Sequence, residues 1–210
     1  MVGWMHYLGR GVERDQQKGV KIIRENESDE FLLGELDCRT EEDFQYCDSL
    51  AARKFFKLCR LGSKQDWLCR HLMAVCLIHS FGVTQNHDKA ARIFEQLANE
   101  NHSDSQYWLG QCHYGSWGKP RNYSKAFEWF SKSADQGNPY GQWMVGHSYY
   151  HHGGVSRDLA KAVEWYRKAA EQGHRQAQYD LGFCYGNGYG VARDWELSTY
   201  WSRKSFAQHR

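Results

Sequence analysis

The sequence repeats itself with a period of 36 residues, and this constrains the fold more than any other feature. Positions that lie 36 residues apart share the same residue type far more often than unrelated positions would. Columns with three or more identical members include Gly110, Gly146 and Gly182; Gly82, Gly118, Gly154 and Gly190; Trp129, Trp165 and Trp201; and Ala90, Ala126 and Ala162. A fixed period of this length indicates a repeat protein, in which each unit contacts mainly its neighbours.

Laid out by this period, the chain forms one array over residues 1–207. The clear units are 66–101, 105–137, 141–173 and 177–207, while 1–27 is a partial unit, 30–62 a degenerate one and 208–210 a tail. Val2 and Gly3 align with the Leu-Gly pair of the last unit, so residue 1 falls inside what should be a helix. We therefore expect the sequence to be part of a longer array.

Each unit carries two helical patterns separated by a turn. Apolar residues recur at steps of three and four in both halves, with polar residues between them. The residues expected to cap the second helices at their N-termini are Asn86, Asn122, Asp158 and Asp194. Gly137 and Gly173 fall where a second helix should end, and Asn138 with Pro139 fits the start of the next first helix. Each unit is thus predicted to be a helix-turn-helix hairpin.

A hairpin with aromatic and alanine-rich faces cannot bury them alone, so successive units are expected to stack. The predicted fold is all-α: an α-α superhelix, or solenoid, of stacked helix-turn-helix repeats. The small residues of the Gly110 column would allow close approach of backbones. We expect the tryptophans of the Trp129 column to fill the space between them.

The stretch "YGNGYGVARDWELSTYW", residues 185–201, could be taken for a phosphate-binding loop. Of its three glycines only Gly190 is glycine in the other units, and the positions of Gly186 and Gly188 vary. No strand precedes it, as a dinucleotide-binding fingerprint would require. We therefore interpret Gly190 as the residue that lets the chain reverse between two helices.

The strings "AQYDLGFCYGNGYGVARDWE" and "DLAKAVEWYRKAAEQGH" resemble the Sel1-like repeat, a relative of the tetratricopeptide repeat. The resemblance covers residues 66–207 well and residues 3–26 partially. It implies a role rather than a reaction, because Sel1-like proteins mostly act as adaptors that hold other proteins together. The expected function is a non-enzymatic scaffold that binds a protein or peptide on its concave face; the alternative is a hydrolase-like enzyme with a pocket on the array.

Composition excludes several other classes of protein. The net charge is only +2, and the basic residues are dispersed, so we expect no nucleic-acid partner. No apolar run is long enough to span a membrane, and the first residues do not form a secretory signal.

The sequence contains seven cysteines, which is an odd number. One branch of the resembled family joins the two helices of a unit by a disulfide. Here Cys76, Cys112 and Cys184 share a column in the first helices, but the second helices of their units offer no partner. Buried reduced thiols and a cytoplasmic protein are the expectation.

No constellation in the sequence supports a catalytic, cofactor or metal site. His147 and His151 are four residues apart, which is the spacing of a two-ligand site on a helix, but nothing nearby completes a ligand set. There is no GxSxG nucleophile motif either. We therefore expect no catalytic residue, no metal and no cofactor.

A partner should contact positions that the repeat does not need for its own packing. Two variable columns of the first helices meet this condition, and their members are Trp108, Met144 and Asp180, and Gln111, His147 and Phe183. Trp108 is the strongest candidate, because a tryptophan at a variable position could anchor a peptide. The alternative is that Trp108 packs against the adjacent unit.

Overall fold

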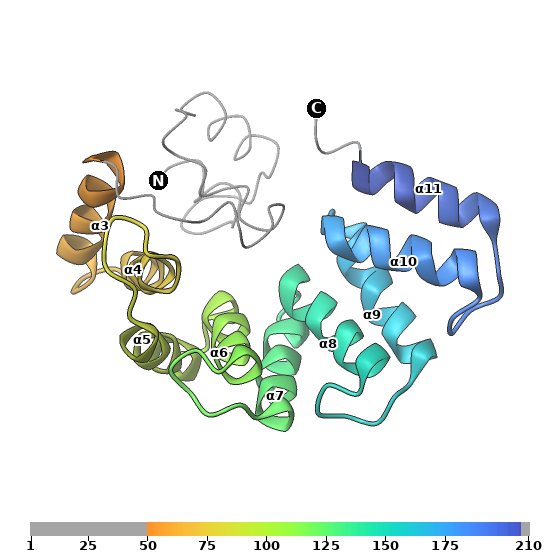
Figure 1. Ribbon diagram of the computed structural model, residues 1–210, viewed down its shortest axis with the longest axis horizontal. Coiled ribbons are helices and arrows are strands. Elements are labelled where there is room, and N and C mark those ends of the chain that lie inside the picture. The colour runs from red at the N-terminus through yellow and green to blue at the C-terminus, as the bar shows by residue number, and fades with distance from the viewer. Residues whose placement is uncertain (1–49, 207–210) are drawn as a thin grey trace. The chain divides into compact units, whose positions relative to one another are not determined.

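The computed structural model describes residues 50–206, and every regular element among them is an α-helix (Figure 1). The helices are α3 (Leu50–Gly62), α4 (Trp67–His79), α5 (His87–Asn99), α6 (Ser103–Gly115), α7 (Tyr123–Asp135), α8 (Pro139–His151), α9 (Leu159–Glu171), α10 (Arg175–Asn187) and α11 (Trp195–Phe206). They confirm the predicted all-α repeat fold. The partial unit 1–27, most of the degenerate unit 30–62 and the tail 208–210 lie outside the described residues.

The chain divides into two compact units, residues 1–85 and 86–210. In the described part of the first unit α3 packs on α4, around Ala52, Cys76 and Phe81. The rings of Phe55 and Phe81 meet edge to face, 6.0 Å apart between centroids.

In the second unit each helix from α5 to α11 packs on the next one along the chain, and α6 also contacts α8. Figure 1 shows α6, α8 and α10, the first helices of their repeats, on one side of this unit. The second helices of these repeats are α7, α9 and α11. We call the first set of helices the first-helix layer and the second set the second-helix layer.

The predicted caps of the second helices are confirmed. The side chains of Asn86, Asn122 and Asp158 accept from the backbone N–H three residues further on, at 2.8, 2.9 and 3.0 Å. Asp194 accepts from two backbone N–H groups, those of residues 196 and 197, at 2.9 Å each. These bonds satisfy donors that the first turn of a helix leaves without partners.

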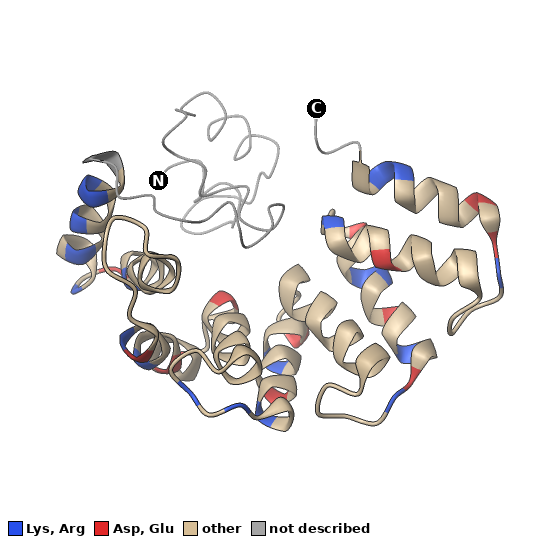
Figure 2. Cartoon of the chain, viewed as in Figure 1, with Lys and Arg blue, Asp and Glu red and all other residues tan. Residues whose placement is uncertain are grey.

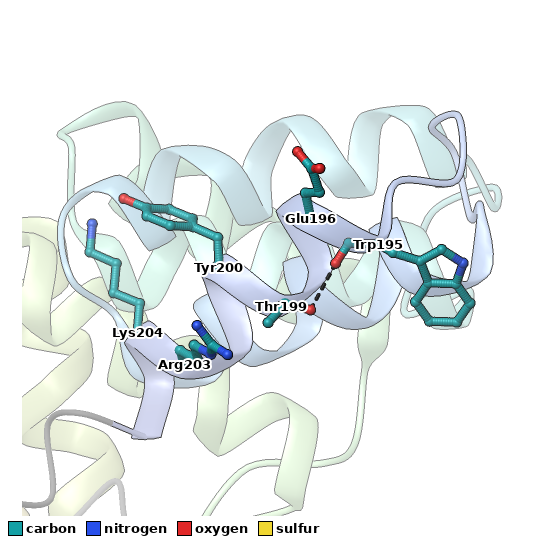
Figure 3. Close-up of a pocket in the computed structure, with 6 residues that line it drawn as sticks. All are labelled: Trp195, Glu196, Thr199, Tyr200, Arg203 and Lys204. Atoms are coloured by element: carbon teal, nitrogen blue, oxygen red, sulfur yellow. Dashed lines mark hydrogen bonds between the residues drawn. The ribbon is translucent and has the colours of Figure 1, made fainter.

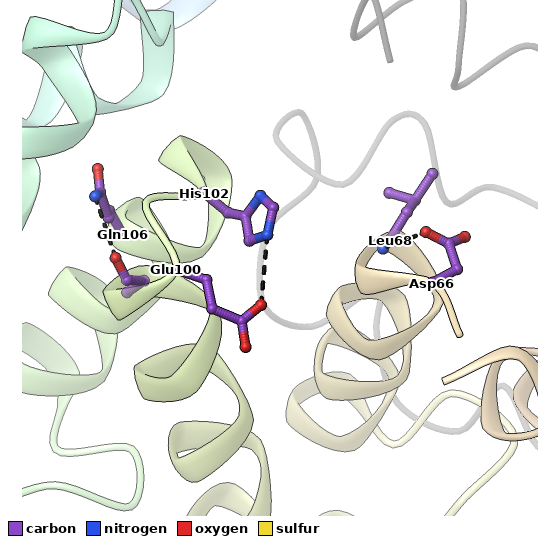
Figure 4. Close-up of polar contacts among 6 residues, drawn as sticks. Asp66, Leu68, Glu100, His102 and Gln106 are labelled. Atoms are coloured by element: carbon purple, nitrogen blue, oxygen red, sulfur yellow. Dashed lines mark hydrogen bonds and ion pairs between the residues drawn. The ribbon is translucent and has the colours of Figure 1, made fainter. Parts of the chain in front are cut away.

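The first helices are capped less uniformly. Asn138 accepts from two backbone N–H groups and Pro139 occupies the first turn, as predicted. Asp66 caps α4 by accepting from the N–H of Leu68 at 3.0 Å (Figure 4). His102 makes no side-chain cap, and its Nε2 lies 3.6 Å from a carboxylate oxygen of Glu100 (Figure 4).

The loop glycine of each repeat packs on the second helix of the repeat before it. Gly118, Gly154 and Gly190 all have positive φ, between 66° and 86°. A Cβ on any of them would overlap the backbone at the first residue of α5, α7 or α9, respectively. The same arrangement places Gly82 against the backbone of Ala52 in the first unit. Only glycine combines this backbone conformation with such close approach, so the turn interpretation of Gly190 is confirmed.

The space beside the first-helix glycines is filled by a different aromatic column from the predicted one. Phe130 is 0% exposed and its ring lies against Gly110, while Tyr166 is 2% exposed and lies against Gly146. Trp129 and Trp165 are only partly buried, with Lys132 and Lys168 lying 4.0 and 3.9 Å from the centroids of their rings. The prediction was therefore wrong for these two tryptophans, because the packing face there is centred on the next residue. Trp201, the third member of the predicted column, is 9% exposed and belongs to the core around Tyr166 and Leu181.

A column of glutamines links successive repeats through buried amides. Gln106, Gln142 and Gln178 are 2%, 7% and 0% exposed. The Nε2 atoms of Gln136 and Gln172 donate to the Oε1 atoms of Gln106 and Gln142 at 2.6 and 2.7 Å. Hydrogen bonds of this kind satisfy polar groups that would otherwise be costly to bury.

Each first helix ends on a residue in the left-handed conformation. These C-cap residues are Ser80, Ser116, His152 and Gly188, with φ of 56°, 62°, 60° and 72°. They form one column of the repeat, in which only the last unit has glycine. A residue with a Cβ is strained there, whereas glycine is not.

Replacing Ser116 with glycine is therefore expected to stabilise the protein by about 0.5–1 kcal/mol, since relief of strain exceeds the added entropy of the unfolded chain. The reverse change, Gly188→Ser, should destabilise it by a similar amount. Urea unfolding of both variants measures the difference. A loss of stability in Ser116→Gly would show that the serine side chain stabilises this cap.

Candidate functional site

The six residues predicted to bind a partner all lie in the first-helix layer, but they do not all face outward. Met144 is 3% exposed and belongs to the core around Phe130 and Val145. A side chain buried to this extent packs inside the protein and offers no surface to a partner. We therefore exclude Met144 from the candidate partner-binding residues.

Trp108 packs against the preceding helix. Its ring stacks on Phe94 of α5, with centroids 5.5 Å apart and an angle of 9° between the ring planes. It also lies near Tyr107 and Trp117, at 5.8 and 6.4 Å between centroids. These contacts agree with the alternative interpretation, in which Trp108 packs against the adjacent unit.

The remaining four candidates line the first-helix layer. Gln111 donates to the Tyr107 hydroxyl at 2.9 Å. His147 and Asp180 are partly buried, and Phe183 is 45% exposed. The structure thus places side chains of three successive first helices in one layer, with Phe183 the most accessible.

A continuous series of aromatic rings runs through this layer, and we call it the aromatic row. Each ring centroid lies 4.4–6.2 Å from the next. In order of contact its members are Phe94, Trp108, Tyr107, Tyr140, His174, Trp143, His147, His151, Tyr150, Tyr189 and Phe183. It therefore connects α5, α6, α8, the start of α10 and the loop before α11.

A hydrogen-bonded carboxylate stands beside the row and joins α8 to α10. The indole N–H of Trp143 donates to Oδ2 of Asp180 at 2.8 Å, and Nε2 of Gln176 donates to Oδ1 at 3.1 Å. Burial raises the pKa of Asp180 above its usual value, and the two hydrogen bonds oppose this rise. The hydrogen bond between Trp143 and Asp180 holds the Trp143 ring in one orientation, stacked on His174 with 5.2 Å between the ring centroids.

Two histidines of the row, the partly buried His147 and the buried His174, are neutral at physiological pH. Burial lowers the pKa of His147 to about 4 and that of His174 to about 3. Nδ1 of His174 accepts from the N–H of Ala177 at 3.1 Å and so caps α10, which assigns the ring proton to Nε2. Neither Nε2 of His174 nor Nδ1 of His147 has a hydrogen-bond partner.

Acidification is expected to destabilise the protein through His174, which is 8% exposed. Its pKa is about 3 in the folded protein and about 6.5 in the unfolded chain. The unfolded chain therefore binds the proton first, and stability is lost as pH falls from about 6.5 towards 3. Between pH 6.5 and 4.5 this loss amounts to about 2 kcal/mol. His174→Asn removes the titrating group but keeps a capping side chain, because asparagine caps α8 at the equivalent position 138. Urea unfolding at both pH values should show a shallower loss in this variant, and an unchanged loss would contradict the assignment.

Charges are divided between the two layers of the second unit (Figure 2). Helix α8 carries no lysine, arginine, aspartate or glutamate, and α10 carries only Arg175 and Asp180. The second helices α7 and α9 carry four and five charged residues, respectively. The first-helix layer is therefore mainly aromatic and amide in character.

The described residues offer little for nucleophilic catalysis. Cys59, Cys69, Cys76, Cys112 and Cys184 are free thiols and buried, as expected, while Cys38 and Cys47 lie outside the described part. Burial raises the pKa of Cys112 and of Cys184 to about 12, so these thiols resist forming the reactive thiolate. Within residues 50–206 no three histidine, cysteine, aspartate or glutamate side chains could share a metal ion.

A surface hollow on α11 also lacks a catalytic set. Figure 3 shows its lining, Trp195, Glu196, Thr199, Tyr200, Arg203 and Lys204, with the Thr199 hydroxyl donating to the carbonyl of Trp195. It contains neither cysteine nor histidine and has a single carboxylate.

No helix in the described part of the chain is long and apolar enough to cross a membrane.

Sequence reasoning missed much of the aromatic row. Tyr107 and Trp143 stand 36 residues apart, and Tyr179 continues their column. This column indicates an aromatic strip on the first helices, but the two columns predicted to bind a partner did not include it. His174 occupies a capping position, and nothing in the sequence signals that its ring also stacks on Trp143.

Comparison with known proteins identifies the repeat. The model of the Sel1 repeat family matches residues 1–22, 67–102, 103–138, 139–174 and 175–209, which together make up most of the chain. No curated protein matches the chain.

Two solved structures are similar in fold. The crystal structure of a Sel1 repeat protein from Oxalobacter formigenes has a TM-score of 0.67 and 19% identity, and the match covers 99% of this chain and 69% of the other. The structure of c5321, a protective antigen present in uropathogenic Escherichia coli strains and displaying an SLR fold, has a TM-score of 0.66 and 21% identity. That match covers 100% of this chain and 45% of c5321, so the chain spans less than half the length of this relative.

Proposed function

Since the chain belongs to the Sel1 repeat family, whose members are generally non-catalytic scaffolds for protein interactions, we propose that it is a non-enzymatic scaffold that binds a partner protein or peptide. The partner is bound on the concave face of the array, which the first helices line. The contacts include Gln111, His147, Asp180 and Phe183, with Trp108 supporting them through the aromatic row.

The observation that carries this proposal is the aromatic row itself. Tyrosine, tryptophan and histidine side chains supply large, rigid contact areas and hydrogen-bonding groups at low entropic cost, which is why they are enriched where proteins bind. The row also ends on an accessible ring, that of Phe183, and Tyr179 on the same helix is 47% exposed. Charged side chains, which are costly to desolvate, are concentrated on the second helices instead.

Selection of 12-residue peptides displayed on phage against the folded chain tests the proposal. Binding of the selected peptides should weaken at least about tenfold in Phe183→Ala, as for an interface residue whose truncation costs more than about 1 kcal/mol. Phe206→Ala is the matched control, because Phe206 is 64% exposed but lies on α11 outside the aromatic row. Peptides that bind Phe183→Ala and the unchanged protein equally would place the interface elsewhere.

A further inference from the structure

The carboxylate of Asp180, which lies within the proposed binding face, can accept more hydrogen bonds than the protein donates to it. Each of its two oxygens accepts one hydrogen bond, from the indole of Trp143 and from the amide of Gln176. An ionised carboxylate has about four acceptor sites, so about two remain. Asp180 is partly exposed, which leaves these sites within reach of a ligand.

Among residues 50–206, no lysine or arginine forms an ion pair with this carboxylate. The ion pairs between described residues are His102 with Glu100, Lys119 with Glu95 and Lys161 with Asp158. The two donors to Asp180 are neutral, and His151 is a favourable electrostatic neighbour of the carboxylate. A partly buried carboxylate without a positive partner is costly to maintain, and a cation from outside would offset that cost.

Cations lie over several aromatic rings of the second helices, and Arg157 lies 5.9 Å from the centroid of the Tyr150 ring on α8. In the described part of the chain, lysines lie over Trp129 and Trp165 at 4.0 and 3.9 Å, and Arg193 lies over Trp195 at 4.1 Å. No lysine or arginine among residues 50–206 lies over Trp143 or Phe183. Aromatic faces attract cations, and the attraction grows when the site is desolvated.

We propose that Asp180, together with the rings of Trp143 and Phe183, binds a lysine or arginine side chain of the partner protein segment. Phe183 lies three residues after Asp180 on α10, so the two side chains share a helix face, and Trp143 reaches the carboxylate from α8. The basic head group takes the open acceptor sites of Asp180, and the rest of the side chain packs beside the rings. This inference rests on the proposed scaffold function and gives the partner a basic residue at this point.

The indole N–H of Trp143 provides a direct reporter, because it donates to the carboxylate in question. Its resonance can be assigned in ¹H–¹⁵N spectra by its loss in Trp143→Phe. Titration with the peptide Ac-Gly-Arg-Gly-NH₂ should shift this resonance, while the citrulline analogue, which is neutral and nearly the same shape, should not. Added salt should weaken the effect, since the attraction is electrostatic.

Asp180→Asn should reduce the affinity for the arginine peptide at least about tenfold, as expected when one partner of a charge pair is removed. Asp104→Asn is the matched control, because Asp104 is the aspartate of α6 and accepts from Asn138 at 2.7 Å. An equal shift with the citrulline peptide, or an undiminished one in Asp180→Asn, would overturn the inference. An equal response to spermidine would assign the site to small cations and would overturn it as well.

The phage selection separates this inference from the function on which it rests. Selected peptides that share a lysine or arginine and lose affinity in Asp180→Asn support both. Selected peptides without a basic residue that still lose affinity in Phe183→Ala would retain the scaffold function and overturn the basic-residue site. Peptides insensitive to both substitutions would overturn both proposals.

Discussion

Replacing Gly154 with alanine is expected to destabilise the protein by about 3 kcal/mol or more. Gly154 has a φ of 86°, in which an alanine is strained by about 1–2 kcal/mol. The added Cβ would also overlap the carbonyl group of Tyr123, so that the loop must move away from α7. Because this contact joins one repeat to the preceding one, the substitution weakens the stacking on which a repeat protein depends.

Gly137→Ala is the matched control for this prediction. Gly137 has a similar φ of 80°, but a Cβ there would meet no atom within 4 Å. Its cost should therefore be the conformational part alone, about 1–2 kcal/mol. Urea unfolding of the two variants measures the difference, and equal costs would show that the close approach to Tyr123 does not stabilise the array.

Phe130→Ala is expected to cost about 3–5 kcal/mol, the range for truncating a large side chain in a core. Its ring is 0% exposed and lies against Gly110, so truncation leaves a cavity between α6 and α7 that the neighbouring backbone cannot close. Thermal or urea unfolding of the variant checks this value.

Truncation of Trp129, the residue next to Phe130, distinguishes the two possible packing faces of the helix. Trp129 is partly buried and its ring is covered by Lys132, so Trp129→Ala should cost only about 1 kcal/mol. If Trp129→Ala proved the more destabilising of the two, the packing face would be centred on the tryptophan column, contrary to the structure.

Much of the local structure could be predicted from the sequence, because it depends on residues close together in the chain. The caps at Asn86, Asn122, Asp158 and Asp194 act over two or three residues, and the structure confirms each of them. The helix-ending role of Gly173 follows from the left-handed conformation, in which it has a φ of 89°. The 36-residue period then extended these assignments from one repeat to the next.

The rotation of each helix about its axis was not predictable in the same way. Successive residues of an α-helix are separated by about 100° around the axis. Assigning the packing face to Trp129 rather than Phe130 therefore misplaces it by about a quarter of a turn. Both residues are aromatic and both belong to periodic columns, so composition and spacing do not distinguish them.

The candidate site was only partly predictable, for a related reason. The two columns selected from the sequence did lie on the first helices, but Met144 packs in the core and Trp108 stacks on Phe94. Variability between repeats identifies positions that are not required to be identical, and such positions can be buried as well as exposed. The pairing of Trp143 with Asp180 joins residues 37 apart, and no local pattern indicates it.

The sequence by itself determined that this protein is an all-α array of Sel1-type hairpins, and it determined where most of their helices begin and end. These properties follow from caps, glycine conformations and periodicity, which are local or repeated. Only the tertiary structure decided which aromatic column fills the core and which residues form the aromatic row. It also placed the carboxylate of Asp180 beside the indole of Trp143, because such contacts depend on the relative rotation and spacing of helices distant in the chain.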